Sequence, residues 1–413
     1  MSYSTGPTGI RNGKLNIISS TSLWNDNFET IERKGIGHPD TISDILAAKI
    51  SQAYSKYTYE HFGVILHHQI DKLMVIGGKT EVAFGSGKFI KPIQIIIAGR
   101  ASYSLGKKTI PVEKILKKVI YSHFSENFSL VKKKDIIINN VLTSFAGPGT
   151  INLSKGAIAN MFNPNNNKEV RGYDKLVAND TSYCVAYSPL SPLEKSILAV
   201  EKYLNSKVTK KLYPWLGTDI KIMAVRNYKE VSITSCVPQI AKYVKSLQQY
   251  QENLNIVGKI MNDKFVKMLP GYKVEISLNT KDDYEKMNIY LTVSGASLSG
   301  DVGVVGRGNR TNGIITSNRP MSMEGTNGKN PRYYSGFIYA NLTKRISKRI
   351  QLELKSSNIV EIVAQNGGSL KNPWQTRIVT NASKNKVEKI VRKEFNNIEK
   401  ITTDFLNGNI ENF

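Results

Sequence analysis

Cysteines are scarce in this sequence, and long apolar runs are missing. Only Cys184 and Cys236 are present, which is too few for a disulfide framework and typical of a reducing compartment. No apolar stretch approaches the ~20 residues that a membrane-spanning helix needs. Residues 1–21 are polar and rich in Gly, Ser and Thr, unlike a secretory signal. We therefore expect a cytoplasmic protein without a membrane partner.

Acidic residues are also few. There are 33 Asp and Glu against 57 Lys and Arg, a formal net charge of +24. Lysine supplies 44 of the 57 basic residues and is scattered along the chain, as in solvated surfaces. Arginine is clustered instead, since six of the 13 lie between residues 307 and 349. We predict a specific anionic ligand and no specific nucleic acid, because no aromatic-plus-basic recognition motif is present.

Residues 300–331 are the most informative stretch. Glycines recur through it, and its charged residues are Asp301, Arg307, Arg310, Arg319, Glu324 and Lys329. Glycines let backbone N–H groups approach an anion, and guanidinium groups bind phosphate oxygens bidentately. The spacing matches neither a P-loop nor a dinucleotide fingerprint. Loops beyond about 15 residues are usually functional or disordered, and nearby apolar runs disfavour disorder. The segment is therefore predicted to hold a polyphosphate.

A second charged segment covers residues 32–44. Pro39 suits the first turn of a helix, and apolar residues at helical spacing predict a helix from about residue 39 to 61. This places His38 at the helix N-terminus and Asp40 in its first turn. The positive end of a helix attracts anions. For Asp40 two interpretations stay open, because its carboxylate could cap the helix or bind Mg²⁺.

Alternating apolar patterns predict more strands than helices. Helical patterns lie at about 39–61, 111–124, 191–205, 239–268, 331–355 and 384–406. The strand-like runs between them often come in adjacent pairs, so the predicted class is α+β with antiparallel or mixed sheets.

Four segments in order resemble those of a known family. They are residues 32–42, residues 65–68 followed by Asp71, residues 178–182, and residues 305–310 continuing through 328–331. Together they resemble the S-adenosylmethionine synthetases (methionine adenosyltransferases), in the form best known from archaea. The resemblance implies three similar, interleaved sheet-plus-helix subdomains over residues 28–413, after an N-terminal tail at 1–27. It also implies a homodimer with active sites at the subunit interface.

The resemblance further implies a reaction and roles for single residues. ATP, L-methionine and water would give S-adenosylmethionine, phosphate and diphosphate, by attack of sulfur on C5′ and hydrolysis of tripolyphosphate. The implied catalytic residues are His38, Arg307 and Lys329, with Asp40 as the Mg²⁺ ligand. The implied ATP- and phosphate-binding residues are Gly147, Gly149, Thr150, Asp180, Asp301, Arg307, Arg310 and Lys329. Asn152 and Asp301 would bind methionine.

Some positions depart from the family pattern. Asn152 stands where an Asp is usual, and Gln69-Ile70 replaces an Asn and a small residue. Lys79 occupies a position where bacterial-type members carry a Glu tied to potassium, so potassium dependence is doubtful. Two alternatives therefore remain: a diverged nucleotide-binding paralogue with a regulatory role, or an adenosyltransferase that uses another thioether.

Overall fold

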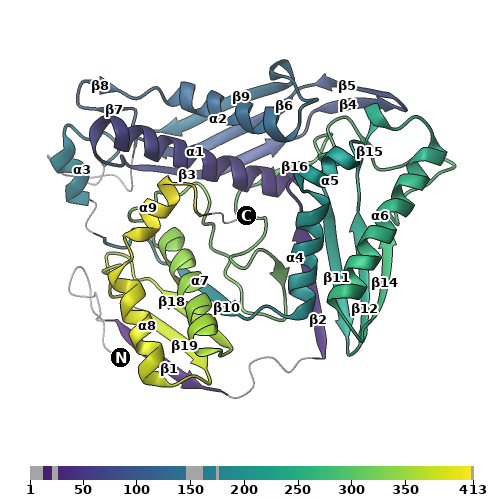
Figure 1. The fold of residues 1–413 in the computed structure, drawn as a ribbon. Coiled ribbons are helices and arrows are strands. Elements are labelled where there is room, and N and C mark those ends of the chain that lie inside the picture. Colours follow the sequence, from purple (N-terminus) through teal and green to yellow (C-terminus); the bar gives the residue numbers. More distant parts are fainter. Residues whose placement is uncertain (1–12, 21–26, 146–160, 174–175, 411–413) are drawn as a thin grey trace, which may run out of the picture.

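The computed structural model describes residues 13–20, 27–145, 161–173 and 176–410. Three larger sheets carry helices packed against one face each, and each sheet-plus-helix unit has its own apolar core (Figure 1). The sheets contain both parallel and antiparallel pairs. The predicted α+β class with antiparallel and mixed sheets is thus confirmed.

The first unit holds the sheet β16-β3-β6-β9. Its strands are β16 (Val302–Val304), β3 (His68–Ile76), β6 (Ile93–Ala101) and β9 (Ile136–Thr143), and its helices are α1 (Pro39–Phe62), α2 (Val112–Asn127) and the short α3 (Asn167–Tyr173). Two-stranded additions are β4 (Lys79–Ala83) with β5 (Ser86–Lys91) and β7 (Ser104–Leu105) with β8 (Lys108–Thr109). A 3₁₀ turn covers Lys133–Asp135. Alternate residues of β6, from Ile93 to Ile97, enter the core under the helices, as the two-residue period of a strand requires.

The second unit holds the sheet β14-β12-β11-β2-β17. Its strands are β14 (Lys273–Leu278), β12 (Glu230–Cys236), β11 (Lys221–Asn227), β2 (Phe28–Lys34) and β17 (Ile315–Thr316), and its helices are α4 (Pro192–Leu204), α5 (Lys207–Leu212) and α6 (Leu247–Met268). The pair β13 (Gln239–Ile240) and β15 (Leu291–Thr292) and a 3₁₀ turn at Ala241–Tyr243 complete it.

The third unit holds the sheet β1-β19-β18-β10. Its strands are β1 (Lys14–Ser19), β19 (Gln375–Thr380), β18 (Asn358–Val363) and β10 (Tyr183–Ser188), and its helices are α7 (Ser335–Leu354), α8 (Lys384–Asn396) and α9 (Lys400–Leu406). Strand β1 pairs in parallel with β19, from the other end of the chain. The division of the chain at residue 27 stays a prediction, although β1 lies within the predicted tail.

Two predicted helices differ from the observed ones. The helix predicted from residue 239 begins only at Leu247, because Ser246 caps it by accepting the N–H of Gln249 at 3.1 Å. The helix predicted over 384–406 is divided into α8 and α9. Asn397 ends α8, and its side-chain amide donates to the Lys393 carbonyl oxygen at 3.0 Å. Local side-chain hydrogen bonds of this kind compete with helix continuation.

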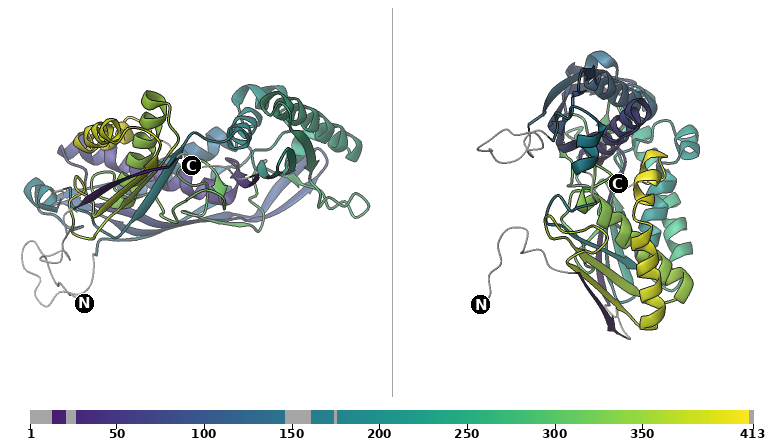
Figure 2. Two further views of the ribbon diagram at one scale, coloured as in Figure 1. Left: turned by 90° about the horizontal axis from the view of Figure 1, so that it is seen from below. Right: turned by 90° about the vertical axis from the view of Figure 1, so that its left-hand side faces the viewer.

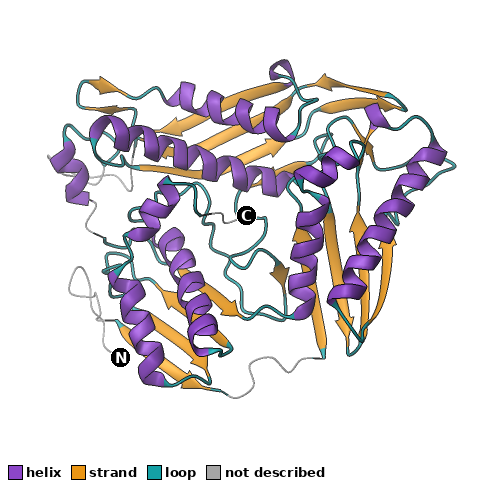
Figure 3. Ribbon diagram, in the orientation of Figure 1, coloured by secondary structure: helices purple, strands orange, loops and turns teal. Residues whose placement is uncertain are grey.

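The helices lie on one side of the molecule and the sheets on the other (Figures 2 and 3). On the first sheet, Ile137, Val141 and Val302 are 43%, 59% and 46% exposed. Ile137 and Val141 alternate along β9 with Ile136 and Ile138, which face the helices. Among the described residues, no helix has the length and apolar character needed to cross a membrane.

Candidate active site

Helix α1 begins where the sequence predicts, and His38 is its cap. Pro39 occupies the first turn, and His38 Nδ1 accepts the backbone N–H of Asp40 at 3.2 Å. A side chain at Gly35 or Gly37, just before the cap, would overlap the backbone at Thr218 and Ile220. The glycines therefore let the chain entering α1 lie directly against the start of β11, which fixes where His38 lies.

The capping interpretation of Asp40 is wrong. Its carboxylate points across to two other segments: Oδ2 accepts from Lys34 Nζ at 2.9 Å, and Oδ1 accepts from the backbone N–H of Val304 at 2.9 Å. These contacts outweigh burial and hold the pKa of Asp40 below its usual value. The carboxylate is therefore ionised and links α1 to the glycine-rich segment.

His38 is a neutral hydrogen-bond donor in this environment. Burial lowers its pKa, although the nearby carboxylates of Asp219 and Asp40 act in the opposite direction. Since Nδ1 accepts a backbone N–H, the proton of the neutral ring lies on Nε2. His38 can therefore donate from Nε2 to an acceptor such as a phosphate oxygen.

Asp219 is a buried carboxylate that sequence reasoning missed. Its Oδ2 accepts from the Tyr290 hydroxyl at 2.5 Å, and its Oδ1 has no hydrogen-bond partner in the part of the chain that the structure describes. Burial raises its pKa. The only sequence signal was a polar residue directly before the apolar strand run at 220–225, and many surface residues share that signal. The buried, unpaired oxygen places an acceptor beside His38.

Asp301 lies close enough to Asp219 to interact with it electrostatically. Ser297 Oγ donates to Asp301 Oδ2 at 3.0 Å, and Asp301 Oδ1 accepts its neighbour Val302's N–H at 2.9 Å. Asp301 raises the pKa of Asp219 through like-charge repulsion. The predicted residues His38 and Asp301 are thus brought to one region, because Asp219 interacts electrostatically with both of them.

The 300–331 segment is a long connection, as predicted, that also contains two short strands. Strand β16 pairs with β3 of the first unit, and β17 pairs with β2 of the second. A side chain at Gly303 would overlap the backbone of Pro39 and Asp40, and one at Gly308 would overlap the Asp44 carboxylate. The segment therefore lies across the N-terminal turns of α1, and at Gly303, where the neighbouring atoms belong to the backbone, only glycine permits this approach.

Asp44 holds the middle of this segment. Its Oδ1 accepts the backbone N–H of Gly306 at 2.8 Å, and it also interacts with Gly308 and Asn327. The side chain is almost fully buried, and this burial raises its pKa to about 6 despite the hydrogen bonds. Near neutral pH the group is thus close to its own titration.

Arg307 and Arg310 are positioned differently. The Arg307 side chain is exposed, and its carbonyl oxygen accepts from Lys34 Nζ at 2.8 Å. Arg310 Nη1 donates to the Gly306 carbonyl oxygen at 2.6 Å, while its buried Nε lacks a partner among the described residues. Arg307 is therefore available to an external anion, whereas Arg310 is engaged with its own loop.

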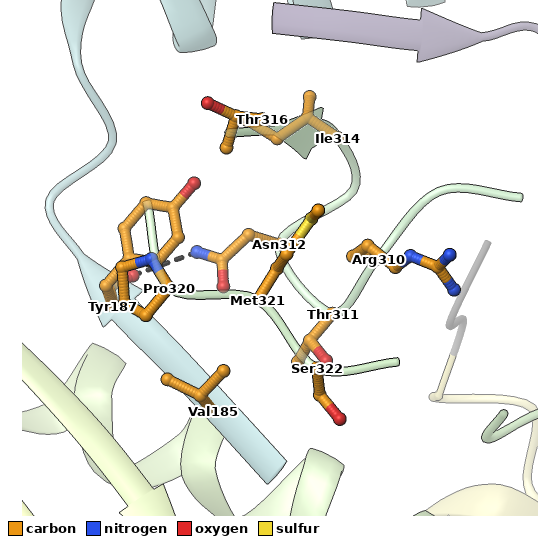
Figure 4. Close-up of a pocket in the computed structure, with 10 residues that line it drawn as sticks. All are labelled: Val185, Tyr187, Arg310, Thr311, Asn312, Ile314, Thr316, Pro320, Met321 and Ser322. Carbon is orange, nitrogen blue, oxygen red and sulfur yellow. Dashed lines mark hydrogen bonds between the residues drawn. The ribbon is translucent and has the colours of Figure 1, made fainter. Parts of the chain in front are cut away.

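A small pocket beside Arg310 is lined partly by Tyr187, Asn312 and Met321 (Figure 4). Asn312 Nδ2 donates to the Tyr187 carbonyl oxygen at 2.9 Å. The Arg310 guanidinium extends away from these side chains (Figure 4). The pocket volume of about 10 Å³ is that of roughly one water site, so it cannot hold a nucleotide.

Lys329 and Asp180 meet around Glu324. Lys329 is buried and contacts Asp71, which sequence reasoning had not assigned to the site. Glu324 interacts with both Lys329 and Asp180, and burial raises its pKa. Asp180 itself is exposed, and its Oδ1 accepts the N–H of Thr181 at 2.8 Å. Glu324 and Asp44 line the same small pocket, which connects this second region to Asp44.

The adjacent histidines near Asp71 are structural. His68 Nε2 lies 2.8 Å from Ser51 Oγ, while His67 packs against Phe162 and Tyr333. Burial lowers the pKa of His67 to about 3 and that of His68 to about 4, so both rings are neutral. The predicted site residues Gly147, Gly149, Thr150 and Asn152 lie outside the described residues.

The described residues contain no group of three or more His, Cys, Asp or Glu side chains that could hold a metal ion. Proteins usually bind Mg²⁺ through one or two carboxylates, while water and substrate phosphates fill the remaining positions. The ionised carboxylate of Asp40 at the start of α1 therefore fits a Mg²⁺ ion that is bound together with phosphate.

Comparison with known proteins identifies the family. The sequence profile of the S-adenosylmethionine synthetase (AdoMet synthetase) family matches residues 11–409. The S-adenosylmethionine synthase of Caldivirga maquilingensis is 35% identical over 405 residues, covering 93% of this chain and 95% of that protein. That of Pyrobaculum aerophilum is 38% identical over 407 residues, covering 95% and 98%. The chain belongs to the S-adenosylmethionine synthetase family, which confirms the resemblance seen in the motifs.

A solved structure gives a weaker match. It is described as an unusual S-adenosylmethionine synthetase from Campylobacter jejuni, and it aligns with a TM-score of 0.49 and 16% identity over 85% of this chain and 80% of that one. At that level of similarity it carries no weight for fold or function.

Proposed function

We propose that this chain is a methionine adenosyltransferase that converts ATP, L-methionine and water into S-adenosylmethionine, phosphate and diphosphate. The observation that carries the proposal is the contact between the two motif segments. Asp40 accepts from Val304, and Lys34 joins Asp40 to the Arg307 carbonyl oxygen. The chain that makes this contact belongs to the S-adenosylmethionine synthetase family, which supports the same activity. It brings His38, Asp40, Asp301 and Arg307 into one region.

The residue types suit this chemistry. A thioether sulfur is neutral and nucleophilic, so attack on C5′ needs no general base, and the bond from C5′ to the triphosphate oxygen breaks as the sulfonium forms. Most of the activation free energy comes from the negative charge that develops on the leaving tripolyphosphate. Preorganised donors lower such a barrier, and removing one typically costs ~10²–10³ in rate.

We assign the donors as follows. Neutral His38 donates from Nε2 to the bridging region of the triphosphate, and the exposed Arg307 binds its phosphate oxygens. Lys329 supplies a further cation, with Arg310 holding the loop through Gly306. Asp40 would hold Mg²⁺, which neutralises phosphate charge when bound. Asp301, Asp180 and Asn152 orient the substrates, and Gly147, Gly149 and Thr150 contact the nucleotide.

We further propose a cytoplasmic homodimer with active sites at the subunit interface. The support is the exposed apolar face of the first sheet, opposite to its helices, since such patches mark protein interfaces. Cytoplasm is supported by Cys184 and Cys236, which are both free. Neither a potassium ion nor a nucleic acid is assigned a site.

The test is an incubation with ATP, methionine and Mg²⁺, with all products followed by mass spectrometry and ion chromatography. We expect S-adenosylmethionine, phosphate and diphosphate, and losses of at least about 10²-fold in His38→Ala and in Lys329→Ala. ATP binding without turnover would instead identify a regulatory paralogue. Hydrolysis of separately added tripolyphosphate, with no S-adenosylmethionine formed from methionine, would indicate that another thioether is the substrate.

A further inference from the structure

The cation of Lys329 is buried in direct contact with Asp71. Its side chain is 5% exposed, and Nζ lies 2.5 Å from Asp71 Oδ1, while Asp71 itself is 38% exposed. A buried ammonium is costly unless a counter-charge lies beside it, because burial favours the uncharged amine. Asp71 is the carboxylate that contacts Nζ.

Other charged and titratable groups also surround Lys329, and their electrostatic effects on it are weaker than that of Asp71. Glu324 acts on it from the glycine-rich segment, and Lys72 opposes its charge from β3. The Tyr334 ring lies with its centroid 5.1 Å from Nζ. Lys72 Nζ lies 3.0 Å from the second oxygen of Asp71 and is 65% exposed. Asp71 thus bridges a buried lysine and a solvated one.

The backbone around this pair is held on both sides. Gln69 and Lys329 form an antiparallel bridge, and Ile70 donates its N–H to the Gly328 carbonyl oxygen at 2.8 Å. Ser51 Oγ of α1 donates to the Lys329 carbonyl oxygen at 2.9 Å. The backbone of Lys329 therefore cannot move outward without breaking these hydrogen bonds.

Gln69 also fixes the carboxylate. Its Nε2 donates to Asp71 Oδ1 at 3.0 Å, the same oxygen that Lys329 contacts. Gln69 is one of the positions at which the sequence departs from the usual family pattern. The side-chain amide keeps Asp71 turned toward Lys329.

We propose that Asp71, oriented by Gln69, is the positioning residue that keeps Lys329 charged and aimed at the phosphates of the nucleotide. The proposal rests on the proposed function for the assignment of Lys329 to phosphate. An ammonium has three N–H donors. One is directed to Asp71, which leaves two for phosphate oxygens.

The sign of the effect follows from the charges. Burial lowers the pKa of Lys329, and the Asp71 carboxylate raises it again. Asp71→Asn keeps a hydrogen-bond acceptor but removes the charge, so the pKa of Lys329 should fall and its proton should be lost at a lower pH. Each unit by which the pKa falls reduces the protonated fraction about tenfold on the alkaline side.

The experiment compares pH–rate profiles of the wild-type protein and Asp71→Asn, with ATP, methionine and Mg²⁺. We expect the alkaline limb of kcat/KM in Asp71→Asn to move acidward by about one pH unit or more. Activity should recover toward the acid side, and Asp71→Glu should restore the limb. Parallel profiles that are lower by a constant factor at every pH would overturn the proposal.

Two further variants sharpen the result. Gln69→Ala should move the alkaline limb of kcat/KM in the same direction, by a smaller amount. This variant tests the proposal even if Asp71→Asn does not fold. Lys72→Ala removes the other partner of Asp71 together with a repelling charge, so its limb should stay or move to higher pH. An acidward shift in Lys72→Ala equal to that of Asp71→Asn would contradict the role of Asp71.

A readout without catalysis separates this proposal from the proposed function. Competitive acetylation followed by peptide mass spectrometry measures the pKa of Lys329 directly. A lower pKa in Asp71→Asn supports the pairing even if the protein makes no S-adenosylmethionine. An unchanged pKa overturns the pairing even if the protein is an active synthetase.

Discussion

At the start of α1, burial moves two pKa values in opposite directions with the same chemical result. It lowers the pKa of His38 and raises that of Asp44 to about 6, so each shift favours the neutral form. For His38 the neutral form is the useful one, because the neutral ring can donate its Nε2 proton. For Asp44 the shift has a cost in stability, because the carboxyl group ionises near neutral pH although it is buried. Stability therefore depends on Asp44 in a way that can be measured.

We expect Asp44→Asn to flatten the dependence of stability on pH. The folded pKa of about 6 lies above the ordinary value of 3.8 for an aspartate in the unfolded chain, so the folded state binds more protons than the unfolded state between these values. This contribution to the free energy of unfolding is present at low pH and is lost as pH rises through about 6, by about 3 kcal/mol in total. Urea denaturation at pH 4 and pH 7.5, without Mg²⁺, measures it.

The amide cannot ionise, so the difference between the two pH values should shrink in Asp44→Asn. The pH dependence of other groups remains in both proteins and cancels in the comparison. If the wild-type protein and the variant lose the same free energy of unfolding between pH 4 and pH 7.5, the raised pKa of Asp44 is wrong.

At the scale of elements, the site depends on how closely β16 approaches α1. Gly303 lies against the backbone of Pro39 and Asp40, where a Cβ atom has no room. We expect Gly303→Ala to separate the two elements, to cost about 1–3 kcal/mol in stability and to reduce activity at least tenfold, since the contact of Asp40 with Val304 would lengthen. Thermal unfolding and the product assay measure both effects.

Gly258 provides the matched control. It lies inside α6, and a Cβ there would meet the Leu278 side chain at an ordinary 3.6 Å. Gly258→Ala should therefore stabilise the protein by about 0.5–1 kcal/mol, through helix propensity, and leave activity unchanged. Equal effects of the two substitutions would show that the packing of Gly303 against α1 is not what supports the site.

At the scale of the whole molecule, the exposed apolar face of the first sheet is the surface on which we propose that the homodimer forms. If the proposed homodimer buries this face, Val141→Asp should place a charge in an apolar interface, convert dimers into monomers and lower activity with them. Sedimentation velocity measures the mass. Val208→Asp on the helix side is the control, because Val208 is 69% exposed on α5. A wild-type monomer, or a dimer that survives Val141→Asp, would refute this interface.

Much of the fold was predictable from local patterns, and some of it was not. Helix α1 was predicted because Pro39 and the apolar spacing are local signals. Strand β1 was missed because its partner β19 comes from the far end of the chain, and a short polar-flanked strand has little signal of its own. Strands β16 and β17 were missed within the glycine-rich segment for the same reason, since their pairing partners β3 and β2 lie far away in sequence.

For the site, the sequence by itself determined the family and the kinds of side chain that the site contains. The residues His38, Asp40, Asp301, Arg307 and Lys329 each lie in a motif that is continuous in the chain. Only the tertiary structure decided which other groups these side chains contact. It turned Asp40 from a helix cap into a bridge to Val304 and added the buried Asp219 beside His38. It also paired Lys329 with Asp71, 258 positions apart. Such pairs depend on burial and strand register, which arise only when distant segments pack, and local sequence carries no record of them.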